Sequence, residues 1–337
     1  MARLAWYDAF GKPSDVLTLK DEETGAPGPH DVVLGMEAVC LHIADVYRVT
    51  GVRPFAAPTA GGIPGAEGVG RVIAVGDRVS RFKVGDRALP PLASGTCRDE
   101  MRLHEDKLIK VEEERGDTLQ LAMATVNPVT SWLLVNAFVE HKRGDWIVQN
   151  GGNSACGRYA IQLARSMGLR TVSAVRRDSV IPELKAAGAD AVVKEGPDMY
   201  KEVAAATGGS DIKLGLDVAG GQGTAWIARC LGELGLIVNY GLMTGEDPVI
   251  PKDLSLGRGL RFQGFMMSRT FNTLYGPERE RSIREKVAHM VAKGTLSAKV
   301  AAVYPLERIV EALEHADRRG SERDGKVLVT CGYYAGP

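Results

Sequence analysis

The sequence predicts an α/β protein with a doubly wound parallel sheet and a second, β-rich domain. Two observations carry this prediction. From about residue 119, short apolar strands alternate with helices, the pattern typical of a parallel sheet covered on both faces. Before that point, short apolar runs are bounded by Gly, Pro and Asp, which favours a small, tightly turned barrel.

The β-rich part is predicted from three runs, at residues 31–42, 67–77 and 85–90. Glycines crowd residues 61–90, where the chain must therefore turn often. In the second part, strands such as "DWIVQN", "RTVSAV" and "GLIVNYG" alternate with helical segments.

The C-terminal segment contains a long helix, a strand, a second helix and a final strand, "GKVLVTC". These elements are too few for a sheet of their own, so we expect them to pack on the N-terminal barrel. The predicted division is therefore 1–122 with 268–337 for the barrel domain, and 123–267 for the parallel-sheet domain.

Composition excludes several classes of protein. The chain has 337 residues, 45% hydrophobic and 25% charged, with 42 basic and 42 acidic side chains. A formal net charge of zero argues against a nucleic-acid or membrane-surface protein. No apolar run approaches the ~20 residues of a membrane span, and the first residues lack a secretory pattern. Five scattered Cys without a C-x-x-C suggest reduced thiols, so a cytoplasmic location is expected.

A glycine-rich turn in "IVQNGGNSACGRYAIQLA" follows one strand and opens a helix. Unpaired N–H groups at such a helix N-terminus suit a pyrophosphate. Gly151 and Gly152 permit the turn, and Gly157 permits close approach of the helix. The spacing departs from G-x-G-x-x-G, so an ordinary strand–helix turn is the alternative.

The next strand ends in "SAVRRD", where an acid would bind the ribose 2′-hydroxyl of NAD. Arg176 and Arg177 stand there instead, and guanidinium groups suit a 2′-phosphate. The sequence therefore predicts NADPH as the cofactor. The alternative is a solvated charge pair at a strand end.

Taken together, seven segments resemble the zinc-free medium-chain dehydrogenase/reductases, in the quinone-oxidoreductase and 2-enoyl thioester reductase branches. They resemble the mitochondrial-type 2-enoyl thioester reductases most closely. The segments are "GAEGVG" (65–70), "VNPVTSW" (126–132), "IVQNGGNSACG" (147–157), "AVRRD" (174–178), "NYGLM" (239–243), "GFMMS" (264–268) and "GKVLVT" (325–330). This resemblance spans the whole chain and implies a GroES-like β-barrel catalytic domain joined to a Rossmann domain.

The resemblance also implies a set of cofactor contacts, with Lys326 approaching from the returning C-terminal segment. By itself, Lys326 is better explained as a surface lysine beside a strand. The implied contacts are Asn127, Thr130, Gly152, Asn153, Ser154, Ala155, Cys156, Gly157, Arg176, Arg177, Asp178, Tyr240, Met243, Phe265, Met267 and Lys326.

No zinc site is expected. The resemblance places His42 where zinc-dependent relatives carry a Cys, and Ala66 where they carry a His. A lone His42 cannot supply the three ligands of a catalytic zinc. Hydride transfer to an activated C=C needs no Lewis acid, because the substrate carbonyl accepts the electron density.

The proton donor is left open by the sequence. The resemblance implies a Tyr at the position of Arg53, which cannot donate a proton but could bind an anionic group. The acid is therefore Tyr47, directly or through water, or water itself, or the chemistry requires none. Tyr47 is equally well explained as a packed aromatic residue. His42 could hydrogen-bond the substrate as a neutral imidazole.

Three functions are therefore compared. The first is NADPH-dependent, zinc-independent reduction of an α,β-unsaturated carbonyl compound, such as an enoyl thioester or an enone. The second is NADPH:quinone reduction, favoured by Asp45 and Tyr47. The third is a non-catalytic NADPH-binding structural or sensor protein. In each case the partner is a small molecule, and the resemblance implies a homodimer.

Overall fold

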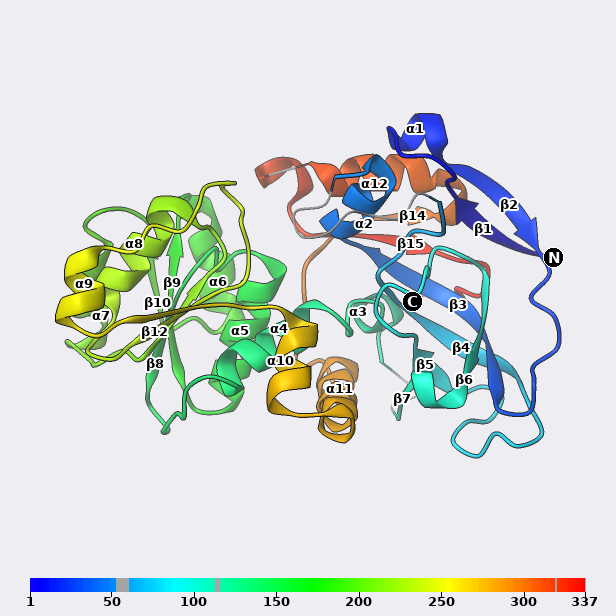
Figure 1. The fold of residues 1–337 in the computed structure, drawn as a ribbon, viewed down its shortest axis with the longest axis horizontal. Helices are drawn as coiled ribbons and strands as arrows, with labels where there is room; N and C mark the ends of the chain where they lie inside the picture. Colours follow the sequence, from blue (N-terminus) through cyan, green and yellow to red (C-terminus); the bar gives the residue numbers. More distant parts are fainter. Residues whose placement is uncertain (53–60, 113–115, 319, 337) are drawn as a thin grey trace. The chain divides into compact units, whose positions relative to one another are not determined.

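The computed structural model describes residues 1–52, 61–112, 116–318 and 320–336. The chain forms two compact units (Figure 1). One unit comprises residues 1–129 and 281–337, and the other comprises residues 130–280. The sequence analysis placed these boundaries at 122/123 and 267/268. Residues 268–280 belong to the second unit partly because Phe271 is buried there and Tyr275 packs edge-on against Trp132.

The second unit contains a six-stranded sheet in the order β10-β9-β8-β11-β12-β13, with every neighbouring pair parallel. This is the strand order of dinucleotide-binding folds, so the predicted doubly wound sheet is confirmed. The strands are β8 (Trp146–Asn150), β9 (Arg170–Val175), β10 (Ala191–Lys194), β11 (Leu214–Asp217), β12 (Leu236–Asn239) and β13 (Arg261–Gly264).

Helices cover both faces of this sheet because successive side chains of a strand point in opposite directions. In β8, Ile147 packs with Ala160 of α5, whereas Val148 packs with Ile227 of α8. The helices of this part are α4 (Asn127–Asn136), α5 (Ala155–Ser166), α6 (Ile181–Ala187), α7 (Met199–Thr207), α8 (Gly221–Cys230), α9 (Lys252–Gly257) and α10 (Met267–Leu274).

A buried polar cluster joins the carboxyl ends of β8, β11 and β12, and we call it the Asp217 network. The Asp217 carboxylate accepts hydrogen bonds from Asn150 Nδ2 (2.6 Å), Thr224 Oγ1 (2.6 Å) and Asn239 Nδ2 (2.9 Å). It also accepts from the backbone N–H groups of Ala219 and Gly220, both at 3.1 Å. The network therefore fixes the loop after β11 at the edge where a parallel sheet binds its ligands.

The first unit is built on a mostly antiparallel sheet in the order β14-β15-β3-β4-β5-β7, with β6 also paired to β3. The C-terminal strand β15 lies antiparallel to β3, so the predicted return of the C-terminal segment to the barrel is confirmed (Figure 1). Strands β1 and β2 form a separate two-stranded sheet. The strands of this unit are β1 (Ala2–Trp6), β2 (Thr18–Glu22), β3 (Asp31–Leu41), β4 (Glu67–Val75), β5 (Arg87–Leu89), β6 (Glu100–His104), β7 (Ile109–Val111), β14 (Val300–Pro305) and β15 (Lys326–Thr330).

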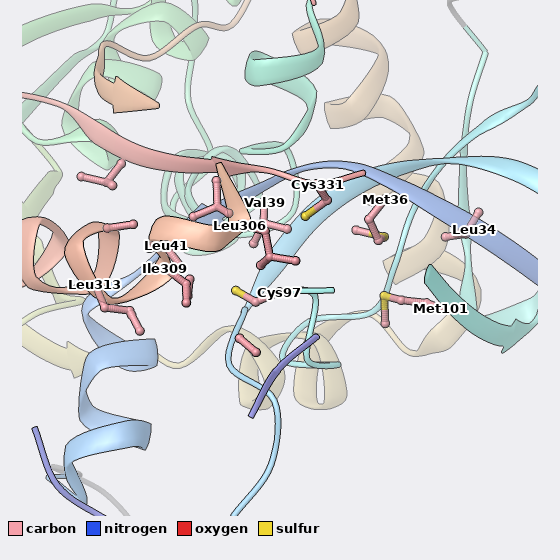
Figure 2. Packing of buried hydrophobic residues seen from close by; sticks show 14 of the residues in the cluster. Leu34, Met36, Val39, Leu41, Cys97, Met101, Leu306, Ile309, Leu313 and Cys331 are labelled. Atoms are coloured by element: carbon pink, nitrogen blue, oxygen red, sulfur yellow. The ribbon is translucent and has the colours of Figure 1, made fainter. Parts of the chain in front are cut away.

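Helices of the first unit close the open side of its sheet. Figure 2 shows part of this core, where side chains of β3 lie near those of the α12 region: Val39, Leu41, Leu306, Ile309 and Leu313. The remaining helices are α1 (Pro13–Val16), α2 (Ile43–Thr50), α3 (Thr118–Leu121), α11 (Pro277–Ala292) and α12 (Ile309–Asp317). Within the described residues, no helix is both long and apolar enough to cross a membrane.

The Asp217 network yields the first prediction. Asp217→Ala leaves buried donors of two asparagines and a threonine without their acceptor, so the free energy of unfolding should fall by about 3 kcal/mol. Urea unfolding followed by far-UV circular dichroism measures this change.

Asp211→Ala is the matched control, because that carboxylate is 62% exposed and pairs with Lys213 on the surface. Its effect should stay below about 1 kcal/mol. An equal loss of stability in the two variants would contradict the importance of the network.

Candidate functional site

The glycine-rich turn between β8 and α5 has the geometry of an anion-binding site. Gly151 adopts a φ of 57°, and a Cβ there would lie 2.4 Å from Val218 Cγ1. A Cβ on Gly157 would lie 2.7 Å from the Gly151 carbonyl oxygen, so the first turn of α5 packs directly on the loop. Ser154 caps α5, its Oγ accepting from Gly157 N at 3.0 Å. The 12-residue helix thus directs its N-terminal dipole at the turn.

Several predicted cofactor residues of the second unit surround this turn. Tyr240 follows β12, and its hydroxyl is hydrogen-bonded to the Ser154 side chain; burial raises the pKa of this phenol. The Met243 side chain is 52% exposed, and its backbone N–H donates to Val218 O at 3.1 Å. Its sulfur lies 3.8 Å from where a Cβ on Gly151 would be. These contacts group Ser154, Tyr240 and Met243 at one edge of the sheet.

Other predicted cofactor residues are engaged in packing. The Phe265 ring lies edge-on to Phe138, with the centroids 6.2 Å apart. Met267 and Thr130 are each only 9% exposed. Cys156 is buried, with its carbonyl accepting from Ser131 Oγ at 2.8 Å. The remaining turn residues Gly152, Asn153 and Ala155 lie in the loop and the first turn of α5.

The basic residues after β9 lie beside the end of β10. Arg176 is 75% exposed, and its Nε lies 4.0 Å from Glu195 Oε2. Arg177 is exposed as well. Asp178 accepts a hydrogen bond from Lys194 Nζ at 2.8 Å. Lys194 and Glu195 were not predicted as site residues, although Lys194 ends the next strand of the alternating pattern and Glu195 follows it.

In the first unit, His42, Glu67 and Lys326 form a compact charged cluster. His42 Nε2 lies 2.5 Å from Glu67 Oε1, and Lys326 Nζ lies 3.4 and 3.5 Å from the two imidazole nitrogens. Glu67 is fully buried. Burial raises the pKa of this carboxyl, but His42 and Lys326 outweigh that effect and hold it below its usual range.

The same cluster tests whether the barrel could hold the zinc of related dehydrogenases. Cys40, His42 and Glu67 place one donor atom each within 4.8 Å of one another, so His42 is not alone as the sequence analysis assumed. The donors nevertheless fit a metal poorly. Glu67 already bonds His42 and the backbone N–H groups of Thr125 and Val126, and burial raises the pKa of the Cys40 thiol. The ammonium of Lys326 adds a positive charge where a metal would bind.

The predicted acid Tyr47 lies on α2, whose N-cap residue is His42. Tyr47 is half-buried, and its hydroxyl makes no hydrogen bond within the part of the chain that the structure describes. Arg53 lies outside the described residues. Asp45, also on α2, is buried and accepts from His42 N (2.9 Å) and Gly65 N (3.0 Å), which fixes the start of the helix. Asn127 begins α4.

The polar residues that hold these parts in place were not predicted from the sequence. Glu67, Asn150 and Asn239 lie within the quoted motifs without an assigned role, and Asp217 lies in none of them. A signal was present, because each of these last three is the polar residue that ends an apolar strand.

Family models match both parts of the chain. An "Alcohol dehydrogenase GroES-like domain" matches residues 28–119, and a "Zinc-binding dehydrogenase" domain matches residues 155–280. The predicted combination of a GroES-like barrel and a Rossmann domain is therefore confirmed.

Two curated relatives are mitochondrial enoyl-acyl-carrier-protein reductases. The protein of Caenorhabditis elegans is 32% identical to this chain, and the aligned region covers 92% of this chain and 90% of the relative. The human protein is 30% identical to this chain, and the aligned region covers 91% of this chain and 83% of the relative. The cytoplasmic location expected from the sequence is therefore wrong, because these relatives are mitochondrial. Neutral charge and reduced thiols do not distinguish the two compartments.

Solved structures agree with this assignment. A complex of Etr1p with NADP and crotonyl-CoA matches with a TM-score of 0.85 and 26% identity, over 98% of this chain and 99% of the other. A putative NADPH:quinone reductase of Bacillus thuringiensis matches with a TM-score of 0.85 and 25% identity, over 98% of both chains. The chain belongs to the family of the mitochondrial enoyl-acyl-carrier-protein reductases, within the zinc-free branch of the medium-chain dehydrogenase/reductases.

Proposed function

We propose that the chain is an NADPH-dependent, zinc-independent reductase that transfers a hydride to the C=C of an α,β-unsaturated thioester. The observation that carries this proposal is the joint presence of a phosphate-binding turn and a basic group at the carboxyl edge of the parallel sheet. The whole-length similarity to Etr1p, solved with NADP and crotonyl-CoA, supports the same cofactor and substrate class.

In this proposal, the diphosphate of NADPH binds at the turn between β8 and α5. Gly152, Asn153, Ser154, Ala155, Cys156 and Gly157 provide the backbone and side-chain contacts. Arg176, Arg177 and Asp178 lie at the adenosine ribose. The residues assigned to the rest of the cofactor are Asn127, Thr130, Tyr240, Met243, Phe265, Met267 and Lys326.

The cluster of His42, Glu67 and Lys326 supports zinc independence. His42 hydrogen-bonds the buried Glu67 carboxylate, and the Lys326 ammonium lies next to His42. These two groups therefore stabilise the charge of Glu67 without a metal ion. We assign Lys326 a double role, as a cofactor contact and as a cation that, after His42, helps to keep Glu67 ionised.

The cofactor and the chain supply different parts of the proposed reaction. When bound, NADPH supplies the hydride to the β-carbon of the substrate. The chain must then protonate the α-carbon of the resulting enolate. Tyr47 is the better candidate for this role than His42, because the imidazole already contacts Glu67 and Lys326 whereas the phenol has no partner among the described residues. Arg53 stays a candidate for binding an anionic group of the substrate.

A quinone reductase is the second candidate function. Asp45 and Tyr47 of α2 favour it, as does the similarity to the quinone reductase fold of Bacillus thuringiensis. A non-catalytic NADPH-binding protein is the third, suggested only by Arg53 in place of the expected tyrosine.

Steady-state assays separate the three functions. NADPH oxidation should be saturable with crotonyl-CoA and much slower with benzoquinone. The reverse order would favour quinone reduction. Binding of NADPH without turnover on either acceptor would contradict an enzymatic role.

Tyr47 provides a second test. Tyr47→Phe removes the only proton that this side chain can donate, so kcat with crotonyl-CoA should fall by roughly 100-fold while KM changes little. Tyr200→Phe is the control, because that ring is 39% exposed on α7 and no role is assigned to it. If Tyr47→Phe turns over as fast as the unmodified protein, another group or water supplies the proton.

We also propose a homodimer that forms through β13. This strand ends the six-stranded sheet, and all four of its residues are exposed, including Phe262 at 39%. A second copy could continue the sheet by pairing with this edge. A related structure holds an Etr1p/Etr2p heterodimer of Candida tropicalis, which supports an assembly of two chains.

Light scattering after gel filtration tests this assembly. The unmodified chain should elute with twice the mass of one chain, and Phe262→Glu should shift it toward the mass of one chain because a charge would be buried at the interface. Leu256→Glu is the control for added charge, since Leu256 is already 85% exposed on α9. A monomeric unmodified chain would contradict the proposal.

A further inference from the structure

The adenosine end of the proposed cofactor site contains both basic and acidic side chains. The inference drawn from them rests on the proposed NADPH dependence. Arg176 and Arg177 favour a 2′-phosphate. Asp178, about 20 residues after the glycine-rich turn, is the kind of residue that binds an unmodified ribose 2′-hydroxyl. The sequence alone therefore contains signals for both nucleotides.

The neighbouring strand resolves this conflict. Lys194 is the last residue of β10, and its backbone pairs in register with Val175, the last residue of β9. Its Nζ lies 2.8 Å from Asp178 Oδ1. Lys194 is 51% exposed and Asp178 is 75% exposed, so both side chains remain accessible to a ligand.

Glu195, the next residue, is paired in a different way. Its side chain is 8% exposed and lies 4.0 Å from the guanidinium of Arg176, which is 75% exposed. Burial raises the pKa of Glu195, and Arg176 opposes that effect. The buried Glu195 carboxyl can thus orient the Arg176 side chain, while the guanidinium of Arg176 stays open to solvent.

We propose that Lys194 is a specificity-determining residue that makes this site accept a 2′-phosphorylated adenosine. Lys194 acts in two ways. It holds the Asp178 carboxylate, which would otherwise be free to bind a 2′-hydroxyl and to repel a phosphate. It also supplies a third cation near Arg176 and Arg177, with Lys194 paired to Asp178 and Arg176 near Glu195.

The Lys194 ammonium has three N–H donors, so it can bind a phosphate dianion while it still holds the Asp178 carboxylate. Charge-assisted hydrogen bonds to phosphate are stronger than those to neutral groups. An unphosphorylated ribose offers no such gain, so it leaves the Lys194–Asp178 pair intact.

Calorimetric titration of the full chain with 2′,5′-ADP and with 5′-AMP tests this inference without depending on catalysis. In Lys194→Ala, the affinity for 2′,5′-ADP should fall roughly tenfold, whereas that for 5′-AMP should stay the same or increase. Adding Asp178→Asn to this variant should restore part of the loss, because it removes the repelling carboxylate.

Lys213→Ala is the matched control. Lys213 also pairs with an aspartate, Asp211, at 2.6 Å and is 42% exposed, but it precedes β11 at the opposite edge of the sheet. This variant should bind both nucleotides as the unmodified chain does.

The outcomes separate this inference from the proposed function. If the unmodified chain prefers 2′,5′-ADP and Lys194→Ala keeps that preference within about twofold, Lys194 is not a determinant although the NADPH assignment stands. If the unmodified chain binds both nucleotides equally, the NADPH assignment and the role of Lys194 both fail. Lys194→Gln, which retains polarity and length, should behave like Lys194→Ala.

Discussion

The Asp217 network is the interaction on which the proposed cofactor site depends. A parallel sheet directs the carboxyl ends of its strands to one edge, where polar groups would be costly to bury without partners. Asp217 accepts hydrogen bonds from the neighbouring strands and from the loop that follows it. That loop contains Val218, which packs against the glycine-rich turn at Gly151. Fixing one carboxylate thus fixes the surface on which a diphosphate would lie.

Each unit also pairs a carboxylate with basic side chains, but one of these carboxylates is buried and the other is exposed. In the barrel unit, the fully buried Glu67 contacts His42, which also contacts Lys326, so the cation belongs to the chain itself. In the other unit, Asp178 and Lys194 form an exposed pair that a ligand can reach. The buried pairing suits a permanent structural role, whereas the exposed pairing suits recognition of a phosphate.

The sequence predicted the doubly wound sheet well, because its buried strands and helices alternate with clear periodicity. The return of the C-terminal strand to the barrel was also predictable, since "GKVLVTC" had no other sheet to join. The pairing of Lys194 with Asp178 was not predictable, because it depends on which strands are neighbours and on their register. For the same reason, Cys40 and Glu67 could not be placed beside His42 from spacing alone: residues on β3 and β4 meet only through sheet pairing.

The central claim is hydride transfer from NADPH to the β-carbon of an enoyl thioester. Incubating the protein with crotonyl-CoA and NADPH that carries two deuterium atoms at the nicotinamide C4 tests it most directly, with the product analysed by mass spectrometry and NMR. The account predicts butyryl-CoA that carries one deuterium at C3 and a solvent proton at C2. Product without deuterium at C3, or deuterium at C2, would contradict it.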